Sequence, residues 1–293
     1  MRPAIWWLAS YPKSGNTWLR TVLFSLMSGG SLDINDLMSL GPTASLRSAF
    51  DDTLGIDSAN LPFERETDLR PRAYEIWAAE AEGPIHCKVH DAYHATPSGE
   101  PLFPTAATRG AIYVARDPRA VAVSNAHHAR RAIDATIATM DSSAATLAGS
   151  PRELSSVLRQ RLLRWSDHVA SWLAAPFPVH LVRYEDMLAD PHAAFAGVAA
   201  FLGLGSDRAA IAAAVEATVF CRLQEQEQRA GFVEKPWRAA AFFREGRSDG
   251  WRRALTPEQA GRIVAAHGPM MRQLGYDVTL APISAEKNLA AAR

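Results

Sequence analysis

The sequence predicts an α/β fold in which a central parallel sheet is covered by helices on both faces. Short apolar runs alternate with longer amphipathic segments along the 293 residues of the chain, the pattern of strands joined by crossover helices. Hydrophobic residues make up 48 % of the sequence, which is enough for a large core. Many α/β enzymes of this length fold as one domain with insertions, so we expect a single domain over residues 1–293.

Four apolar runs are the expected strands. The first, at residues 4–10, contains two adjacent tryptophans, and the second spans residues 84–89. The third covers residues 110–115 and ends directly before Arg116, and the fourth covers residues 179–182. Short continuous apolar runs of this kind are typical of strands that are buried on both faces.

Apolar residues at spacings of three and four predict the helices. The helical pattern of residues 16–27 is followed by Gly29 and Gly30, which stop a helix. Asp117 followed by Pro118 is typical of an N-cap with proline at the first helical position. The expected helices are residues 16–27, 72–81, 118–131, 153–174, 191–202, 207–219 and 257–274. Residues 132–151 are expected to form an exposed connection or a short helix, and residues 224–250 a polar, irregular segment.

Composition excludes several classes of function. The 31 basic and 31 acidic side chains balance, so a nucleic-acid partner is not expected. Two distant cysteines, Cys87 and Cys221, predict neither a disulfide framework nor a structural zinc site, and they favour a cytoplasmic location. The sequence shows no apolar stretch long enough for a membrane span and no secretory signal, so stable membrane insertion is not expected.

The turn after the first strand predicts a site for an anion. Lys13, Ser14, Gly15 and Thr17 lie between an apolar run and an amphipathic segment. A small-residue turn that leads into a helix offers backbone N–H groups and the positive end of the helix dipole to a phosphate or sulfate. The turn does not match GxxxxGK[ST], which disfavours an ordinary nucleoside triphosphatase.

Two further pairs stand where strands of a parallel sheet should end. Arg116 follows the third strand and Ser124 lies two turns into the next helix, so both can face a ligand crevice. Lys88 and His90 are two residues apart and point the same way, and a histidine there can act as a general base. Each residue alone has an ordinary structural explanation, such as an ion pair or a packed histidine.

The remaining candidates are a histidine cluster and a C-terminal loop. The spacing of His86, His90 and His94 puts no set of three ligands on one face, so no metal site is expected. The sequence FFREGRSDGW, at residues 242–251, combines arginines and glycines that can wrap a phosphate. Such a loop is more often simply solvated.

Taken together and in this order, the motifs make the chain resemble the sulfotransferases that use 3′-phosphoadenosine 5′-phosphosulfate (PAPS). YPKSGNTW resembles their 5′-phosphosulfate loop, VARDPRAVAVS their 3′-phosphate element and CKVHDAY the stretch with the catalytic histidine. RYEDMLADP resembles the segment near the adenine, and FFREGRSDGW loosely resembles the C-terminal RKGxxGDW loop. The resemblance implies a P-loop-like, three-layer αβα fold. It also implies metal-independent transfer of a sulfuryl group to a hydroxyl or amine of a small-molecule, sugar or lipid acceptor.

The resemblance also implies roles for individual residues. His90 would be the base, Lys88 would support the transferred group, and Lys13 would stabilise the departing phosphate. The cofactor-binding residues would be Lys13, Ser14, Gly15, Asn16 and Thr17 at the 5′ end, Arg116, Ser124, Arg244, Glu245 and Gly246 at the 3′-phosphate, and Trp18, Tyr184, Thr218 and Phe220 near the adenine. Glu245 stands where the family has a lysine, and Arg247 is a candidate for the missing charge.

The acceptor and the quaternary structure are open at this point. Acceptor-side insertions are expected near residues 33–75, 127–150 and 224–243, and a homodimer is compatible with the sequence. Aromatic candidates for an acceptor pocket are Trp77, Tyr93, Phe103 and Trp237, with core packing as the ordinary alternative. Two other functions remain: a P-loop small-molecule kinase, and a nucleotide-binding relative without catalysis.

Overall fold

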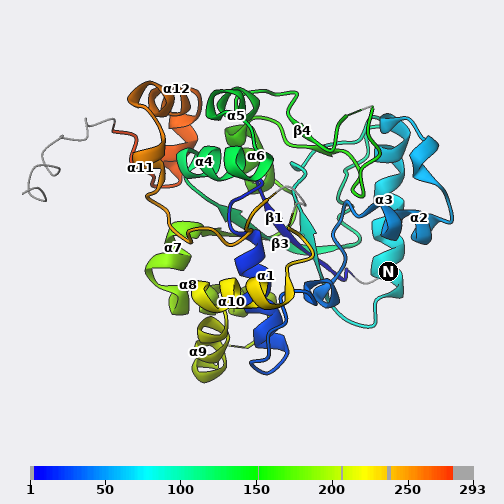
Figure 1. Ribbon diagram of the computed structural model, residues 1–293. Helices are drawn as coiled ribbons and strands as arrows, with labels where there is room; N and C mark the ends of the chain where they lie inside the picture. Colours follow the sequence, from blue (N-terminus) through cyan, green and yellow to red (C-terminus); the bar gives the residue numbers. More distant parts are fainter. Residues whose placement is uncertain (1–2, 151, 206, 236–238, 280–293) are drawn as a thin grey trace, which may run out of the picture.

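The computed structural model describes residues 3–150, 152–205, 207–235 and 239–279. Its centre is a four-stranded, all-parallel sheet in the order β2-β1-β3-β6 (Figure 1). The strands are β1 (Ile5–Ser10), β2 (Ile85–Val89), β3 (Thr108–Ala115) and β6 (Val179–Arg183). The four predicted strands are therefore confirmed, and the first lies in the interior of the sheet.

Helices cover both faces of the sheet, as predicted. Alternate residues of β1 point to opposite faces, so Trp7 and Ala9 belong to one core cluster and Trp6 and Leu8 to the other. The first cluster is closed by α4 (Pro118–Ala129), α5 (Ile133–Met140), α6 (Trp165–Leu173) and α12 (Pro257–Gln273), and the second by α1 (Asn16–Met27), α8 (Pro191–Leu202) and α9 (Arg208–Ala217) (Figure 1).

Local signals in the sequence fix several helix ends. Asp117 Oδ1 accepts from the N–H of Arg119 at 2.9 Å and caps α4, with Pro118 at the first position. Thr256 and Gln259 form a reciprocal capping box at the start of α12. The predicted N-cap at Asp117 is thereby confirmed.

The expected helix at residues 72–81 is the C-terminal part of a longer one. Helix α3 (Phe63–Glu80) starts after Pro62, and Glu64 and Glu66 in its first turn suit the positive end of the helix dipole. The other elements are α2 (Arg47–Leu54), α7 (Tyr184–Ala189), α11 (Trp251–Ala254), the short strands β4 (Thr146–Leu147) and β5 (Gln160–Arg161), and the 3₁₀ turns Leu37–Leu40 and Ser58–Asn60.

The predicted helix over residues 153–174 is wrong in its first half. Helix α6 spans only Trp165–Leu173. In the preceding segment, the N–H of Leu158 donates to Ser45 O at 2.7 Å, that of Arg159 to Glu66 Oε1 at 3.0 Å and that of Arg161 to Asp91 Oδ1 at 3.0 Å. Because these tertiary acceptors replace the helical hydrogen bonds, the apolar periodicity of the segment does not produce a helix.

The expected irregular segment at residues 224–250 begins inside a helix, α10 (Phe220–Ala230), and the expected helix at residues 207–219 ends early, at Ala217. Helix α10 is strongly polar, and Leu223 is its buried apolar residue. Its buried Glu227 accepts hydrogen bonds from the backbone N–H groups of Phe242 and Phe243, at 2.7 and 3.0 Å. Within the described part of residues 231–250 the chain is irregular, as predicted.

Candidate active site

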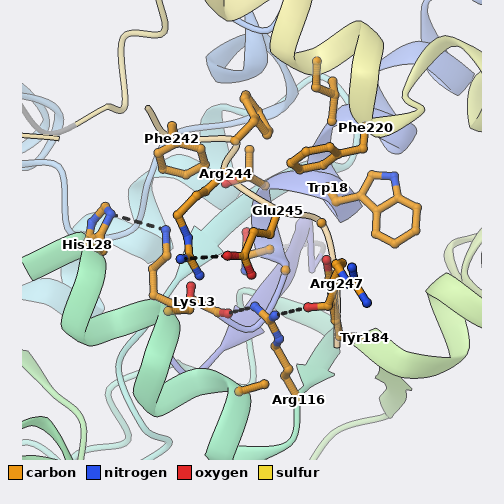
Figure 2. Close-up of a pocket in the computed structure, with 18 of the residues that line it drawn as sticks. Lys13, Trp18, Arg116, His128, Tyr184, Phe220, Phe242, Arg244, Glu245 and Arg247 are labelled. Carbon is orange, nitrogen blue, oxygen red and sulfur yellow. Dashed lines mark hydrogen bonds and ion pairs between the residues drawn. The ribbon is translucent and has the colours of Figure 1, made fainter. Parts of the chain in front are cut away.

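A cavity of about 500 Å³ opens where the strands of the sheet end, and it collects residues from distant parts of the chain (Figure 2). The turn after β1, the ends of β2 and β3, helix α4 and the loop before α11 all contribute to its wall. Among the residues predicted from the sequence, the cavity is lined by Lys13, Gly15, Asn16, Thr17, Trp18, Lys88, His90, Arg116, Ser124, Tyr184, Thr218, Phe220, Arg244, Glu245 and Gly246. Ser14 is buried beneath the turn, with a relative exposure of 1 %.

The turn between β1 and α1 has a backbone that only particular residues adopt easily. Lys13 and Gly15 have positive φ values of 70° and 110°. A Cβ atom on Gly15 would lie 2.6 Å from Cδ2 of Tyr184, so the tyrosine ring needs a glycine beneath it. The first N–H groups of α1 have no acceptor within the helix, and the N–H of Leu19 is bonded to Gly15 O. The turn therefore presents the N-terminus of α1 to the cavity.

Asn16 anchors this turn to the strand before it. Its Nδ2 donates to Leu8 O at 2.7 Å and to Ser10 Oγ at 3.3 Å, and the side chain is buried. The amide nitrogen is thus used inside the protein, and the contribution of Asn16 to a ligand would come from its backbone N–H.

Lys13 points into the cavity beneath an aromatic residue. Its Nζ lies 3.3 Å from His128 Nδ1 and 4.3 Å from the ring centroid of Phe242 (Figure 2). Burial lowers the Lys13 pKa to about 8, and the neighbouring cations Arg116, Lys88 and Arg244 act in the same direction. The ammonium group is therefore partly desolvated and poorly balanced by protein carboxylates, as expected for a group that receives an anion.

Arg116 connects the turn to the loop before α11. One guanidinium nitrogen donates to Lys13 O at 3.0 Å and the other to Arg247 O at 2.7 Å. The guanidinium lies 4.3 Å from the ring centroid of Tyr184, and its buried Nε has no partner among the described residues. Since an arginine carries five N–H donors, Arg116 retains donors for an anion in the cavity.

The hydrogen bonds of His90 define the tautomer of its ring. Nδ1 lies 2.9 Å from Ser10 O, and a carbonyl oxygen only accepts, so Nδ1 carries the proton and Nε2 presents a lone pair. Burial lowers the His90 pKa to about 3, with Lys88 as the next cause. His168 Nε2 lies 3.0 Å from the backbone oxygen of His90 and supports the end of β2. His90 is consequently neutral at neutral pH, with the Nε2 lone pair free of a proton.

Lys88 lines the cavity two residues before His90, and Glu234 binds it there. Lys88 Nζ donates to Glu234 Oε2 at 2.7 Å, and the second oxygen of this carboxylate accepts from Arg20 Nη1 at 2.6 Å. The two cations lower the Glu234 pKa to about 2 against the opposing effect of burial. Glu234 is thus a fixed negative charge in the wall of a cavity whose other charged groups are mostly cations.

Aromatic rings form one end of the cavity. The ring centroids of Trp18 and Tyr184 are 5.9 Å apart with an edge-on geometry, and Phe220 packs against Gly246. A Cβ atom on Gly246 would lie 2.5 Å from the Phe220 ring, and Gly246 has a φ of 61°. The hydroxyl of Thr218, directly after α9, donates to Ala214 O in the last turn of that helix at 2.9 Å. This end offers flat apolar surfaces of the kind on which a nucleobase stacks.

The loop before α11 carries its own counter-ions. Arg244 Nη1 lies 2.9 Å from Glu245 Oε1, and Arg247 Nε lies 3.1 Å from Asp249 Oδ1. Glu245, at the position where the resemblance would place a lysine, therefore pairs with its neighbour Arg244 (Figure 2). An incoming phosphate would compete with these carboxylates for the two guanidinium groups.

Four residues of the cavity wall had no individual role assigned from the sequence. His128, Leu147 and Glu234 lie in the expected acceptor-side insertions, and Phe242 is the first residue of the C-terminal motif. The aromatic candidates Tyr93 and Phe103 instead pack around Trp172 in the core, and Trp77 donates to Thr53 Oγ1. The fourth candidate, Trp237, lies outside the described residues.

Neither a metal cluster nor a membrane-spanning helix is present in the part of the chain that the structure describes. Within residues 3–150, 152–205, 207–235 and 239–279, no group of three or more His, Cys, Asp or Glu side chains could hold a metal ion. None of the helices in these ranges combines the length and the hydropathy needed to cross a bilayer.

Comparison with known proteins gives one consistent family. The sulfotransferase domain family matches residues 4–275. Two curated relatives, Cytosolic sulfotransferase 17 and Cytosolic sulfotransferase 16 of Arabidopsis thaliana, are each 24 % identical over 279 residues. The match covers 89 % of this chain and 72 % and 74 % of the two relatives, respectively.

Solved structures show the same fold. Retinol dehydratase in complex with androsterone and the inactive cofactor PAP has a TM-score of 0.62 at 20 % identity, covering 93 % of this chain and 82 % of that one. Mouse sulfotransferase SULT7A1 complexed with PAP has a TM-score of 0.61 at 18 % identity, covering 93 % and 86 %. The predicted P-loop-like, three-layer αβα fold is confirmed by these neighbours and by the sheet itself.

Proposed function

Because this chain belongs to the sulfotransferase domain family, we propose that it transfers a sulfuryl group from PAPS to a hydroxyl or amine of an acceptor held in the described cavity. The observation that supports this most strongly is that the turn at residues 11–18 and Arg116 share one cavity. A nucleotide with phosphates at both its 5′ and 3′ ends needs two such anion sites close together.

The residues present fit this nucleotide. The N-terminus of α1 and Lys13 would hold the 5′ end, since N–H groups and an ammonium group meet there. Arg116, with its unpartnered buried Nε, and Ser124 on α4 would hold the 3′-phosphate. Trp18, Tyr184 and Phe220 would enclose the adenine. When bound, PAPS supplies the activated sulfuryl group, and the protein supplies position and charge.

The chemistry assigned to the protein has two parts. His90 accepts the proton of the attacking hydroxyl at Nε2, because Nδ1 is held by Ser10 O. Lys13 stabilises the negative charge that develops on the departing phosphate oxygen, and its partial desolvation strengthens that interaction. Lys88 supplies a second positive charge on the acceptor side of the cavity. No step in this scheme requires a metal ion.

Two of the three expected insertions contribute to the cavity wall, and we assign the acceptor side to that part of the wall. His128 and Leu147 come from residues 127–150, and Glu234 and Phe242 from residues 224–243, whereas residues 33–75 do not contribute to the cavity wall. The mixture of aromatic, aliphatic and imidazole groups in the cavity that His90 also lines favours an alcohol with an apolar body. Androsterone and retinol, bound by retinol dehydratase, are alcohols of this type. A cytoplasmic location and a homodimer remain predictions from the sequence.

A panel of acceptors tests the proposed function. The protein is incubated with PAPS and, in turn, with steroid, phenol, sugar, lipid and amine acceptors, and the products are analysed by mass spectrometry. We expect at least one alcohol to gain the mass of one sulfo group, with release of PAP. A protein that binds PAP but modifies none of these classes would be a nucleotide-binding relative without this activity.

A further inference from the structure

The carboxylate of Glu234 occupies a position for which the proposed reaction has no obvious use. It lies in the wall of a cavity that is suited to a highly anionic nucleotide, yet it is itself negative. The backbone beside it is anchored, since the N–H of Val233 donates to Asn35 Oδ1 at 2.8 Å and Asn35 Nδ2 donates to Gly231 O at 3.2 Å. Glu234 is therefore built into the site and needs a physical explanation.

The two oxygens of Glu234 have different partners. Arg20 is on α1 and only 1 % exposed, and a nearby carboxylate offsets the cost of removing its guanidinium from water. Lys88 lies on the cavity wall, and its ammonium group has three donors, of which Glu234 takes one. A bond of 2.7 Å to a fixed carboxylate restricts the rotation of this long side chain and directs the two remaining donors.

We propose that Glu234 is a positioning residue, which holds Lys88 protonated and directs its free donors into the cavity. The effect of Glu234 on turnover rests on the proposed function, whereas its effect on the protonation of Lys88 does not.

The charges around Lys88 explain why a carboxylate is needed. Burial and Arg20 lower the Lys88 pKa, and Glu234 opposes both effects. The other charged or titratable groups of the cluster are Lys13 in the turn after β1, His90 at the end of β2, His128 on α4, and Arg244 in the loop before α11, which pairs with Glu245. Glu234 is the carboxylate that contacts Lys88, so without it the lysine would lose its proton at a lower pH.

Titration of the lysine side chains tests the proposal directly. The chain has four lysines, at positions 13, 88, 235 and 287, so protein labelled with ¹³C at lysine Cε gives four signals, and K88R assigns that of Lys88. We expect E234Q to move the Lys88 titration to lower pH, and E234D to restore it toward the wild-type position. The matched control is E216Q. Glu216 is exposed, lies outside the cavity wall, and accepts a hydrogen bond of 2.8 Å from Arg222. An unchanged Lys88 titration in folded E234Q would overturn the proposal.

A double-mutant cycle gives the consequence for turnover. We expect E234Q to lower kcat about 10- to 100-fold, the equivalent of one charge-assisted hydrogen bond. In the K88M background the same change should have little further effect, because Lys88 is the group through which Glu234 acts. Equal losses in both backgrounds would show that Glu234 only anchors Arg20.

Two outcomes keep the inference separate from the proposed function and from folding. If wild-type protein transfers no sulfuryl group while the Lys88 titration still depends on Glu234, the proposed function fails and the positioning role stands. If E234Q does not fold, R20M is compared with R20M/E234Q, where no buried guanidinium is left without its acid. An identical Lys88 titration in that pair would also contradict the proposal.

Discussion

Replacement of Gly15 by alanine tests the geometry of the anion-binding turn. Gly15 has φ 110° and ψ 11°, a conformation that costs a residue with a Cβ atom about 1–3 kcal/mol. The new methyl group would also lie 2.6 Å from Cδ2 of Tyr184. This ring cannot move freely, because the Arg116 guanidinium lies 4.3 Å from its centroid and Trp18 packs against its edge. We therefore expect G15A to lose more stability than backbone strain alone would cause.

Gly55 provides the matched control for this substitution. It caps α2 with φ 65° and ψ 36°, and a Cβ atom there would meet nothing within 4 Å. G55A should cost only the strain of a left-handed alanine, about 1–2 kcal/mol. The difference between the two variants in urea denaturation isolates the clash with the tyrosine ring, and in a Y184A background the cost of G15A should fall to that of G55A.

Nucleotide binding is the decisive assay for G15A. Because the turn and Tyr184 cannot both keep their positions, we expect the affinity for PAP to fall at least about tenfold in calorimetry, equivalent to about 1.4 kcal/mol. G55A should bind PAP like the unmodified protein. A G15A protein with unaltered PAP affinity would refute the assignment of this turn to the 5′ end of the nucleotide.

Three further predictions concern the charged residues of the cavity. His90→Asn removes the lone pair of Nε2, so turnover should fall about 10²- to 10⁴-fold with PAP affinity retained in calorimetry; near-normal turnover would exclude His90 as the base. Arg116→Met should weaken PAP about 10- to 100-fold and 5′-AMP much less, and equal losses would argue against a 3′-phosphate contact. The Lys13 pKa of about 8 predicts that kcat/KM for PAPS falls as pH rises above that value. Lys13→Arg should move this limb to higher pH, and an unmoved limb would point to another group. With a His90 pKa of about 3, no acidic limb from His90 is expected near pH 6.

The sequence predicts the sheet and the nucleotide side of the cavity because local rules determine both. The run from Ile5 to Ser10 is apolar at every position but its last, Asp117 and Pro118 define a helix start, and the turn at residues 11–18 carries its own chemistry. Parallel strands end at the same edge of the sheet, so residues that directly follow strands, such as Arg116, are brought together by topology alone.

Residues 153–164 and helix α10 (Phe220–Ala230) show where local rules are insufficient. The apolar spacing in the first segment suits a helix, but its N–H groups bond to Ser45, Glu66 and Asp91, which lie far away in the sequence. Helix α10 is polar on most of its surface, and its buried Glu227 is satisfied by backbone groups of the following loop. Both outcomes depend on tertiary partners that no sequence window contains.

Glu234 and His128 were missed for a related reason. A glutamate in a polar, irregular segment normally remains in solvent. Glu234 is held in the cavity wall by Arg20 and Lys88, which are more than 140 positions away. His128 belongs to a pair of adjacent histidines near the end of a helix, which a solvated helix end explains equally well. Its place beside Lys13 follows only from the packing of α4 against the turn.

The turn at residues 11–18 and Arg116 together form the proposed site for a nucleotide with phosphates at both its 5′ and 3′ ends. This pairing is tested by calorimetric titration of the unmodified protein with PAP and, separately, with ATP and magnesium. We expect tight, one-to-one binding of PAP and weak binding of ATP. Binding of ATP as tight as that of PAP would contradict this site, because Arg116 would then not distinguish a nucleotide with a 3′-phosphate from one without it.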